Sequence, residues 1–342
     1  MTNRERVRRA LRGEKVDRVP LTAYEWMWED WGEIEHLAHR GLTPTRHVET
    51  CRRLTPEVAF EEETFRRDGR DWQREFMRTP AGTLQKLSME GWTQQYWVRE
   101  PADYEVIEWM VRHCELEEDH AAFLREQEAM GDRGIVVVSA HRSPIQEIMV
   151  DLVGLETFCY HLADEVEELY SCHAAMMERT ERELEIIAAG PGEFVKLWEN
   201  FTAETFGAER FEQFHLPVYR RAAELFGPEG KRLMAHTDGE LARVQHLLPE
   251  SGLDILESLT PPSEGDVAPE QWREVWPEMV FWCNVPVSWY GEAPEDFAGR
   301  LRGLLEGVGD TRGLLLEISE DLPRNWPESL PVALEVLEEW GE

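Results

Sequence analysis

The sequence of 342 residues has no apolar run approaching the roughly 18 residues that a membrane-spanning helix needs. Its first residues lack the apolar stretch of a secretory signal, so we expect a cytoplasmic protein with no membrane partner. The five cysteines are odd in number and without a C-x-x-C pair, which argues against a disulfide framework and a zinc ribbon. The sequence also has no G-x-G-x-x-G, P-loop or G-x-S-x-G motif, which argues against the common nucleotide-binding and serine-hydrolase classes.

Basic charge is scarce as well. The chain has 36 Lys and Arg residues against 69 Asp and Glu residues, a formal net charge of -33. Such a field repels phosphate backbones and anionic lipids, so no nucleic-acid partner is expected. A small-molecule substrate is expected instead.

What the sequence does contain is an alternation of short apolar runs and helix-length periodic segments. It predicts an amphipathic helix over residues 3–12 and then eight strands, at 18–23, 57–61, 135–140, 194–198, 232–236, 254–256, 279–283 and 314–318. Helical periodicity lies between most of them, at 163–189, 211–225, 241–248, 294–307 and 330–340. Eight strands separated by helices favour an α/β fold of the (β/α)8 TIM-barrel type, and residues 1–342 are predicted to form one such domain.

Two insertions depart from a plain barrel. Residues 68–99 alternate polar and apolar side chains around Pro80-Ala81-Gly82, which predicts a β-hairpin inserted after the second strand. Residues 146–162 predict one or two extra helices after the third strand. Insertions on this side of a barrel lie over its mouth and can form a lid.

Polar residues follow the predicted strands, and in a barrel the carboxyl ends of all strands meet at one rim. Gathered acids repel one another unless a cation or a proton compensates, which indicates a metal ion or a carboxyl with a raised pKa. One imidazole and two carboxylates, from His236, Asp238 and Glu320, suit either a divalent metal or proton transfer. The alternative is a polar rim without chemistry. The candidate rim residues are Tyr24, Glu25, Glu62, Glu63, His141, Arg142, Glu199, Asn200, His236, Asp238, Glu257, Asn284, Glu320 and Asp321.

The opening segment M-T-N-R-E-R-V-R-R-A-L-R-G-E-K-V-D-R-V-P resembles the start of the uroporphyrinogen decarboxylase superfamily. That superfamily also contains zinc-dependent, corrinoid-linked methyltransferases. Further matches keep the family order: E-N-F-T at 199–202, H-T-D-G at 236–239, E-S-L-T-P-P at 257–262 and I-S-E-D-L-P at 318–323. The resemblance spans nearly the whole chain and implies a (β/α)8 barrel.

The resemblance is closer to the methyltransferase branch than to the decarboxylases. The decarboxylases carry an arginine-containing segment after the first strand, whereas residues 23–30 here read A-Y-E-W-M-W-E-D and would repel a polycarboxylate. The zinc ligands of the methyltransferases resemble His-x-Cys and a later Cys, which match His236, Asp238 and Glu320. Carboxylates at both thiolate positions imply a retained site with an altered metal preference, Zn²⁺ first and Mn²⁺ or Fe²⁺ as alternatives. In the metal-free alternative, Asp238 and Glu320 only hydrogen-bond His236.

The favoured hypothesis is metal-assisted methyl (one-carbon) transfer linked to a corrinoid protein. The sequence has no cobalamin-binding Asp-x-His-x-x-Gly motif, so a corrinoid would arrive on that partner. One alternative is decarboxylation of a porphyrinogen or another carboxylated ring compound, and another is a non-catalytic corrinoid-pathway binding protein. The sequence leaves the oligomeric state open, and the resemblance is compatible with a homodimer, because dimers are frequent in the superfamily. The expected catalytic residues are His141, Glu199 and Glu257, the metal ligands are His236, Asp238 and Glu320, and the substrate-binding residues are Tyr24, Glu25, Asn200 and Asn284.

Overall fold

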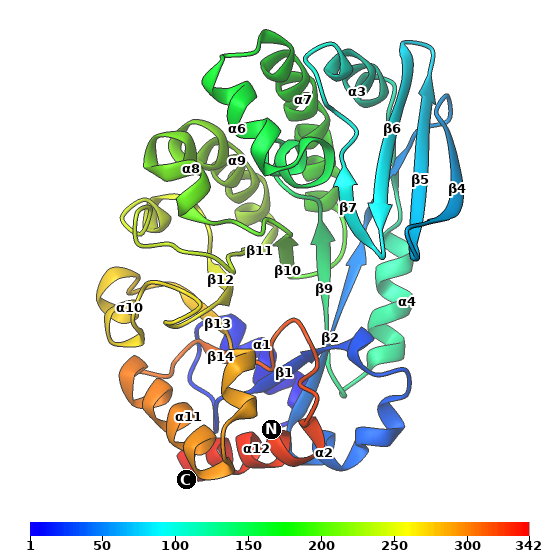
Figure 1. Cartoon of the computed structure of the whole chain (residues 1–342). Helices are drawn as coiled ribbons and strands as arrows, with labels where there is room; N and C mark the ends of the chain where they lie inside the picture. Colours follow the sequence, from blue (N-terminus) through cyan, green and yellow to red (C-terminus); the bar gives the residue numbers. More distant parts are fainter. Residues whose placement is uncertain (342) are drawn as a thin grey trace. The chain divides into compact units, whose positions relative to one another are not determined.

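The computed structural model describes residues 1–341, which divide into two compact units (Figure 1). Unit 1 comprises residues 1–50, 120–140 and 188–341, and unit 2 comprises residues 51–119 and 141–187. That the two units act as the single domain expected from the sequence stays a prediction. No helix among the described residues is long and apolar enough to cross a membrane.

Unit 1 is built on a closed barrel of eight parallel strands, in the order β1-β14-β13-β12-β11-β10-β9-β2. This confirms the (β/α)8 fold. Most of the strands read as apolar runs because each is covered on both faces, by the barrel interior and by the outer helices. The barrel strands are β1 (Leu21–Tyr24), β2 (Leu42–Glu49), β9 (Ile135–Ala140), β10 (Phe194–Leu197), β11 (Arg232–His236), β12 (Ile255–Leu259), β13 (Val280–Asn284) and β14 (Leu314–Glu317).

Helix α1 closes the amino end of the barrel. Its side chains Val7, Ala10 and Leu11 are buried in one cluster with Ile135 and Phe194, the first residues of β9 and β10. The chemistry is therefore left to the opposite, carboxyl end. The helices of unit 1 are α1 (Asn3–Leu11), α2 (Glu35–Arg40), α4 (His120–Met130), α8 (Ala203–Arg210), α9 (Leu216–Phe226), α10 (Pro269–Val275), α11 (Pro294–Val308) and α12 (Trp326–Gly341), with short 3-10 or π segments at Glu25–Met27, Trp31–Ile34, Phe211–His215, Gly227–Glu229, Leu248–Glu250 and Val287–Gly291.

The second barrel strand is not where the sequence placed it. The prediction was 57–61, whereas the barrel uses β2, Leu42–Glu49. This strand was not predicted because it contains Pro44, and a proline normally argues against a central strand. It is tolerated since the pairing of β2 with β9 begins only at Thr45, so Pro44 pairs with β1 alone. The residues thought to follow this strand, Glu62 and Glu63, lie instead on β4 of unit 2 and pair with Glu75 and Arg74.

The helix predicted at 241–248 is also wrong. Backbone bonds there run from Val244 to Leu241 and from Leu247 to Val244, which makes successive turns and not an α-helix. Pro249 follows within the short 3-10 segment Leu248–Glu250. A proline there would interrupt an α-helix that continued from residue 241.

Unit 2 contains a four-stranded antiparallel sheet in the order β4-β5-β6-β7 and a separate β3-β8 pair. The predicted hairpin is confirmed as β5 and β6, with Thr79 pairing Gly82 across Pro80-Ala81, but the sheet is larger and begins at Ala59. The predicted extra helices after the third barrel strand are also present. The elements are β3 (Cys51–Leu54), β4 (Ala59–Arg67), β5 (Arg70–Thr79), β6 (Gly82–Met89), β7 (Trp92–Gln95), β8 (Glu115–Glu118), α3 (Asp103–Arg112), α5 (Pro144–Glu147), a π segment (Ile148–Val153), α6 (Leu155–Ala163) and α7 (Glu167–Ala189).

Candidate functional site

The centre of the candidate site is the carboxylate of Glu257, which is fully buried on β12. Its Oε1 accepts from Lys196 Nζ at 2.8 Å and from the Tyr24 hydroxyl at 2.9 Å, and its Oε2 lies 2.8 Å from Nδ1 of His236. Burial alone would raise the pKa of the Glu257 carboxyl, but the charges of Lys196 and His236 hold it well below its usual range. Glu257 is therefore a fixed anion inside the barrel, held from three other strands.

A bulge in β12 brings a second side chain into the same network. Successive side chains of a regular strand point to opposite faces, but the pairing of β12 with β13 shifts between Glu257 and Leu259, and Ser258 has φ +62°. Ser258 Oγ accepts from the amide of Asn284 and donates to Glu320 Oε1 at 3.1 Å. Two consecutive residues of one strand thus serve one site.

His236 ends β11 and connects the buried and the solvent-facing parts of the site. Its Nδ1 faces Glu257, and its Nε2 lies 2.9 Å from Glu320 Oε1 and 3.9 Å from Asp238 Oδ2. Burial disfavours the imidazolium, yet the neighbouring carboxylates Glu257 and Glu320 raise the pKa of His236 to about 9. The side chains of Asp238 and Glu320 are 31% and 43% exposed, so this side of the imidazole is open to solvent.

The spacing of these groups fits a divalent metal. One potential ligand atom from each of His236, Asp238 and Glu320 lies within 4.8 Å of the others. A tetrahedral zinc site with bonds of about 2.1 Å separates its ligand atoms by about 3.4 Å, which lies between the two distances from Nε2. The carboxylate at Nδ1 matches the usual arrangement around a metal-binding histidine, in which a second group fixes the ring. The same geometry also suits a metal-free imidazolium that donates from both nitrogens.

The two flanking carboxyls differ in how they titrate. Burial raises the pKa of the Asp238 carboxyl above its usual value. The hydrogen bond from His236 lowers the pKa of the Glu320 carboxyl. The two carboxyls are therefore shifted in opposite directions.

Several other residues predicted for the site are placed differently. Tyr24 belongs to the network but is buried, so its hydroxyl holds Glu257 and Lys196. Asn284 reaches the network through Ser258. Glu25 pairs with Arg46 at 2.9 Å. Glu199 is buried beside Tyr219 of α9. Burial raises the pKa of Tyr219, and the charge of Glu199 raises it further.

The structure also places His141 and Asn200. His141 lies in unit 2, where its Nδ1 is 3.2 Å from the buried Glu183. Asn200 follows β10 with φ +50° and is half-buried. Their catalytic and substrate-binding roles stay predictions.

Two buried ionisable residues near the site, Lys196 and Glu317, were not predicted from the sequence. Lys196 lies within β10, and its ammonium is paired with Glu257. Burial lowers the pKa of Lys196, although the charge of Glu257 acts to raise it. Glu317 lies at the end of β14, with Oε2 2.7 Å from Thr22 Oγ1, and burial raises its pKa to about 8. The only sequence signal for either is a charged residue inside an apolar run.

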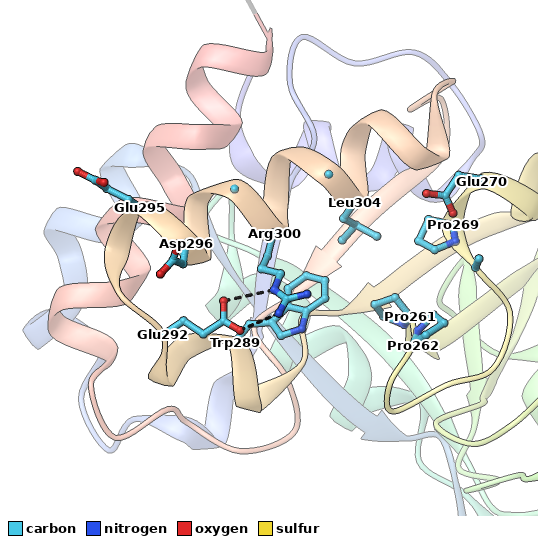
Figure 2. A pocket seen from close by; sticks show the side chains of 13 residues that line it. Pro261, Pro262, Pro269, Glu270, Trp289, Glu292, Glu295, Asp296, Arg300 and Leu304 are labelled. Atoms are coloured by element: carbon cyan, nitrogen blue, oxygen red, sulfur yellow. Dashed lines mark hydrogen bonds and ion pairs between the residues drawn. The ribbon is translucent and has the colours of Figure 1, made fainter.

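A groove of about 730 Å³ also lies in unit 1, beside α10 and α11 (Figure 2). Pro261, Pro262 and Trp289 supply apolar surface, and Arg300 pairs with Glu292 at 3.1 Å. The remaining charged lining residues are acidic: Glu270, Glu295 and Asp296. The groove shares no lining residue with the His236 network.

No protein-family model matches the chain, and no curated protein sequence matches it. Solved structures do match. One is a methyltransferase from Methanosarcina mazei, with a TM-score of 0.60, 13% sequence identity and coverage of 100% of both chains. At this identity the likeness shows a shared fold alone. The resemblance to the uroporphyrinogen decarboxylase superfamily stays a prediction.

Proposed function

We propose that the chain is a methyltransferase-like enzyme in which His236, Asp238 and Glu320 hold a divalent metal ion. The observation that carries the proposal is the position of His236, whose Nδ1 is held by buried Glu257 while its Nε2 faces two solvent-accessible carboxylates. The fold shared with the Methanosarcina mazei methyltransferase supports the choice of reaction class. Zn²⁺ is the first choice, and Mn²⁺ or Fe²⁺ also accept one nitrogen and two oxygen ligands.

When bound, such an ion supplies Lewis-acid chemistry that makes a thiol or hydroxyl acceptor more nucleophilic near neutral pH. The acceptor provides the electron pair for the new bond to the methyl carbon. The bond between that carbon and the donor breaks, and the donor keeps its electron pair. The acceptor's proton leaves to solvent, to which the site opens beside Asp238 and Glu320.

The residues of the surrounding hydrogen-bond network keep His236 and Glu320 in position. Glu257 fixes the orientation of the ring and the nitrogen that faces outward. Lys196 and Tyr24 hold Glu257, while Ser258 accepts from Asn284 and donates to Glu320. The methyl donor in this proposal is a small methylated molecule or a corrinoid carried by a partner protein.

One observation favours a second candidate, metal-free proton transfer of the kind a decarboxylase uses. His236 has a pKa of about 9, so without a metal it is an imidazolium near neutral pH and can act as a general acid. Metal content separates the two candidates.

The test is metal analysis of protein purified without chelator, followed by calorimetric titration of chelator-treated protein with Zn²⁺, Mn²⁺ and Fe²⁺. We expect a single ion per chain, loss of binding in His236→Ala and weaker binding in Glu320→Ala, because too few ligands remain to offset dehydration of the ion. The exposed His246 is the matched control, and His246→Ala should bind as the wild type does. Equal binding by wild type and His236→Ala would reject the metal and favour the proton-transfer candidate.

A further inference from the structure

Four aromatic side chains gather next to His236 in unit 1. Tyr24 and Trp26 stack with ring centroids 4.3 Å apart, and the ring of His47 lies 5.4 Å from Tyr24 and 4.8 Å from Trp198. We call Tyr24, Trp26, His47 and Trp198 the aromatic cluster. They come from β1 and the turn after it, from β2 and from the residue that follows β10. Trp198 also lies 5.7 Å from the ring of His236, so the cluster borders the proposed metal site.

The aromatic cluster contains one exposed ring, that of Trp26, and one ring whose nitrogens lack hydrogen-bond partners in the part of the chain that the structure describes, that of His47. Trp26 is 59% exposed although the Tyr24 ring beneath it is buried. Neither ring nitrogen of His47 has a hydrogen-bond partner among the described residues, and both are buried. Burial also keeps the pKa of His47 well below its ordinary value, so the ring is neutral near pH 7. His47 therefore adds an aromatic surface that does not repel a cation.

Rings of this cluster already contact a cation. The ammonium of Lys196 lies 3.6 Å from the centroid of Trp198 and 4.9 Å from that of Tyr24. Its charge is balanced by Glu257, whose Oε1 lies 2.8 Å from the ammonium. The rings of the cluster therefore already hold one ammonium group, which favours a positively charged ligand over an anionic one.

We propose that the aromatic cluster binds the methylated ammonium group of a small substrate. Trp26 offers the exposed ring face, and Trp198 and His47 border the bound group on the side of His236. Attraction between the cation and the ring quadrupoles supplies the affinity, as in other sites for quaternary ammonium groups. This inference rests on the proposed function only for the bound group's role as methyl donor, because binding itself needs no metal.

The test compares choline with 3,3-dimethyl-1-butanol, a neutral molecule of nearly the same shape, by calorimetry and tryptophan fluorescence on chelator-treated full-length protein. A cation–π contact of the usual size predicts that choline binds roughly 3- to 30-fold more tightly. Trp26→Ala should weaken choline binding by a similar factor, and Trp26→Phe should retain part of it. The matched control is Trp92, which is 76% exposed in unit 2, and Trp92→Ala should bind choline as the wild type does.

Equal or tighter binding of the neutral molecule would overturn the proposal and indicate an apolar ring substrate. Unchanged choline affinity in Trp26→Ala, with an unchanged unfolding temperature, would overturn it too. The proposed function fails separately: choline binding without any metal binding would reject the metal site and retain the ammonium site.

Discussion

At the scale of single residues, the fully buried pair of Lys196 and Glu257 dominates the energetics of the site. Removing one partner of a buried ion pair typically costs about 3 kcal/mol or more, and without Lys196 the buried Glu257 carboxylate keeps only His236 as a charged partner among the described residues. We therefore expect Lys196→Met to lower the free energy of unfolding by about 3 kcal/mol. The double variant Lys196→Met/Glu257→Gln should lose less than Lys196→Met, because the buried carboxylate that lost its ammonium partner is then replaced by a neutral amide.

Urea unfolding measures both effects. The matched control is the exposed pair Arg302–Glu339, at 2.8 Å, where Arg302→Met should cost less than about 1 kcal/mol. A cost for Lys196→Met as small as that of the control would contradict the expected role of the buried pair.

The titration of His236 gives a second prediction. Its pKa is raised from 6.5 to about 9, so in metal-free protein its contribution to stability is complete below pH 6.5 and is lost as the pH rises through about 9. The shift corresponds to about 3 kcal/mol. The difference in unfolding free energy between chelator-treated wild type and His236→Asn should shrink by this order between pH 6.5 and pH 9. Glu317 is present in both proteins, so its titration cancels. Parallel stability curves would show that His236 is not held as an imidazolium.

Part of this site follows from the sequence and part does not. His236, Glu257 and Asn284 were found because each lies at the carboxyl end of an apolar run, and Asp238 and Glu320 because each follows one. Lys196 lies inside a strand, and only the closed barrel shows that its ammonium reaches Glu257. The role of Ser258 depends on a strand irregularity that side-chain periodicity does not encode.

At the scale of elements, the bulge in β12 makes its own prediction. Ser258 has φ +62°, a conformation that glycine adopts without the steric cost of a Cβ. Ser258→Ala and Ser258→Gly both remove the hydroxyl that contacts Glu320 and Asn284, but only the first keeps the strained backbone. We expect Ser258→Gly to be more stable than Ser258→Ala by about 1 kcal/mol, measured by chemical unfolding. If Ser258→Ala is the more stable of the two, the left-handed backbone at this residue is wrong.

Elements were predictable where burial on both faces produced a continuous apolar run, as in β9, β11 and β13. β2 was missed because Pro44, Arg46 and His47 interrupt its pattern, and their tolerance depends on neighbours that the local sequence does not show. The aromatic cluster was hidden for the same reason, since His47 lies on the strand that was missed.

At the scale of the whole molecule, a net charge of -33 predicts a dependence of stability on salt. Like charges repel in the compact state, and this repulsion is screened when the Debye length falls from about 30 Å at 0.01 M salt to about 3 Å at 1 M. Screening also weakens exposed ion pairs such as Arg302–Glu339, but each of those contributes less than about 1 kcal/mol. With 69 acidic residues against 36 basic ones, repulsion should dominate.

We expect the unfolding temperature to rise by a few degrees between these NaCl concentrations, measured by calorimetry. NaCl is preferred to sulfate, because sulfate strengthens apolar burial by a separate mechanism. A fall in the unfolding temperature would mean that the surface ion pairs stabilise the fold more than the excess acid destabilises it.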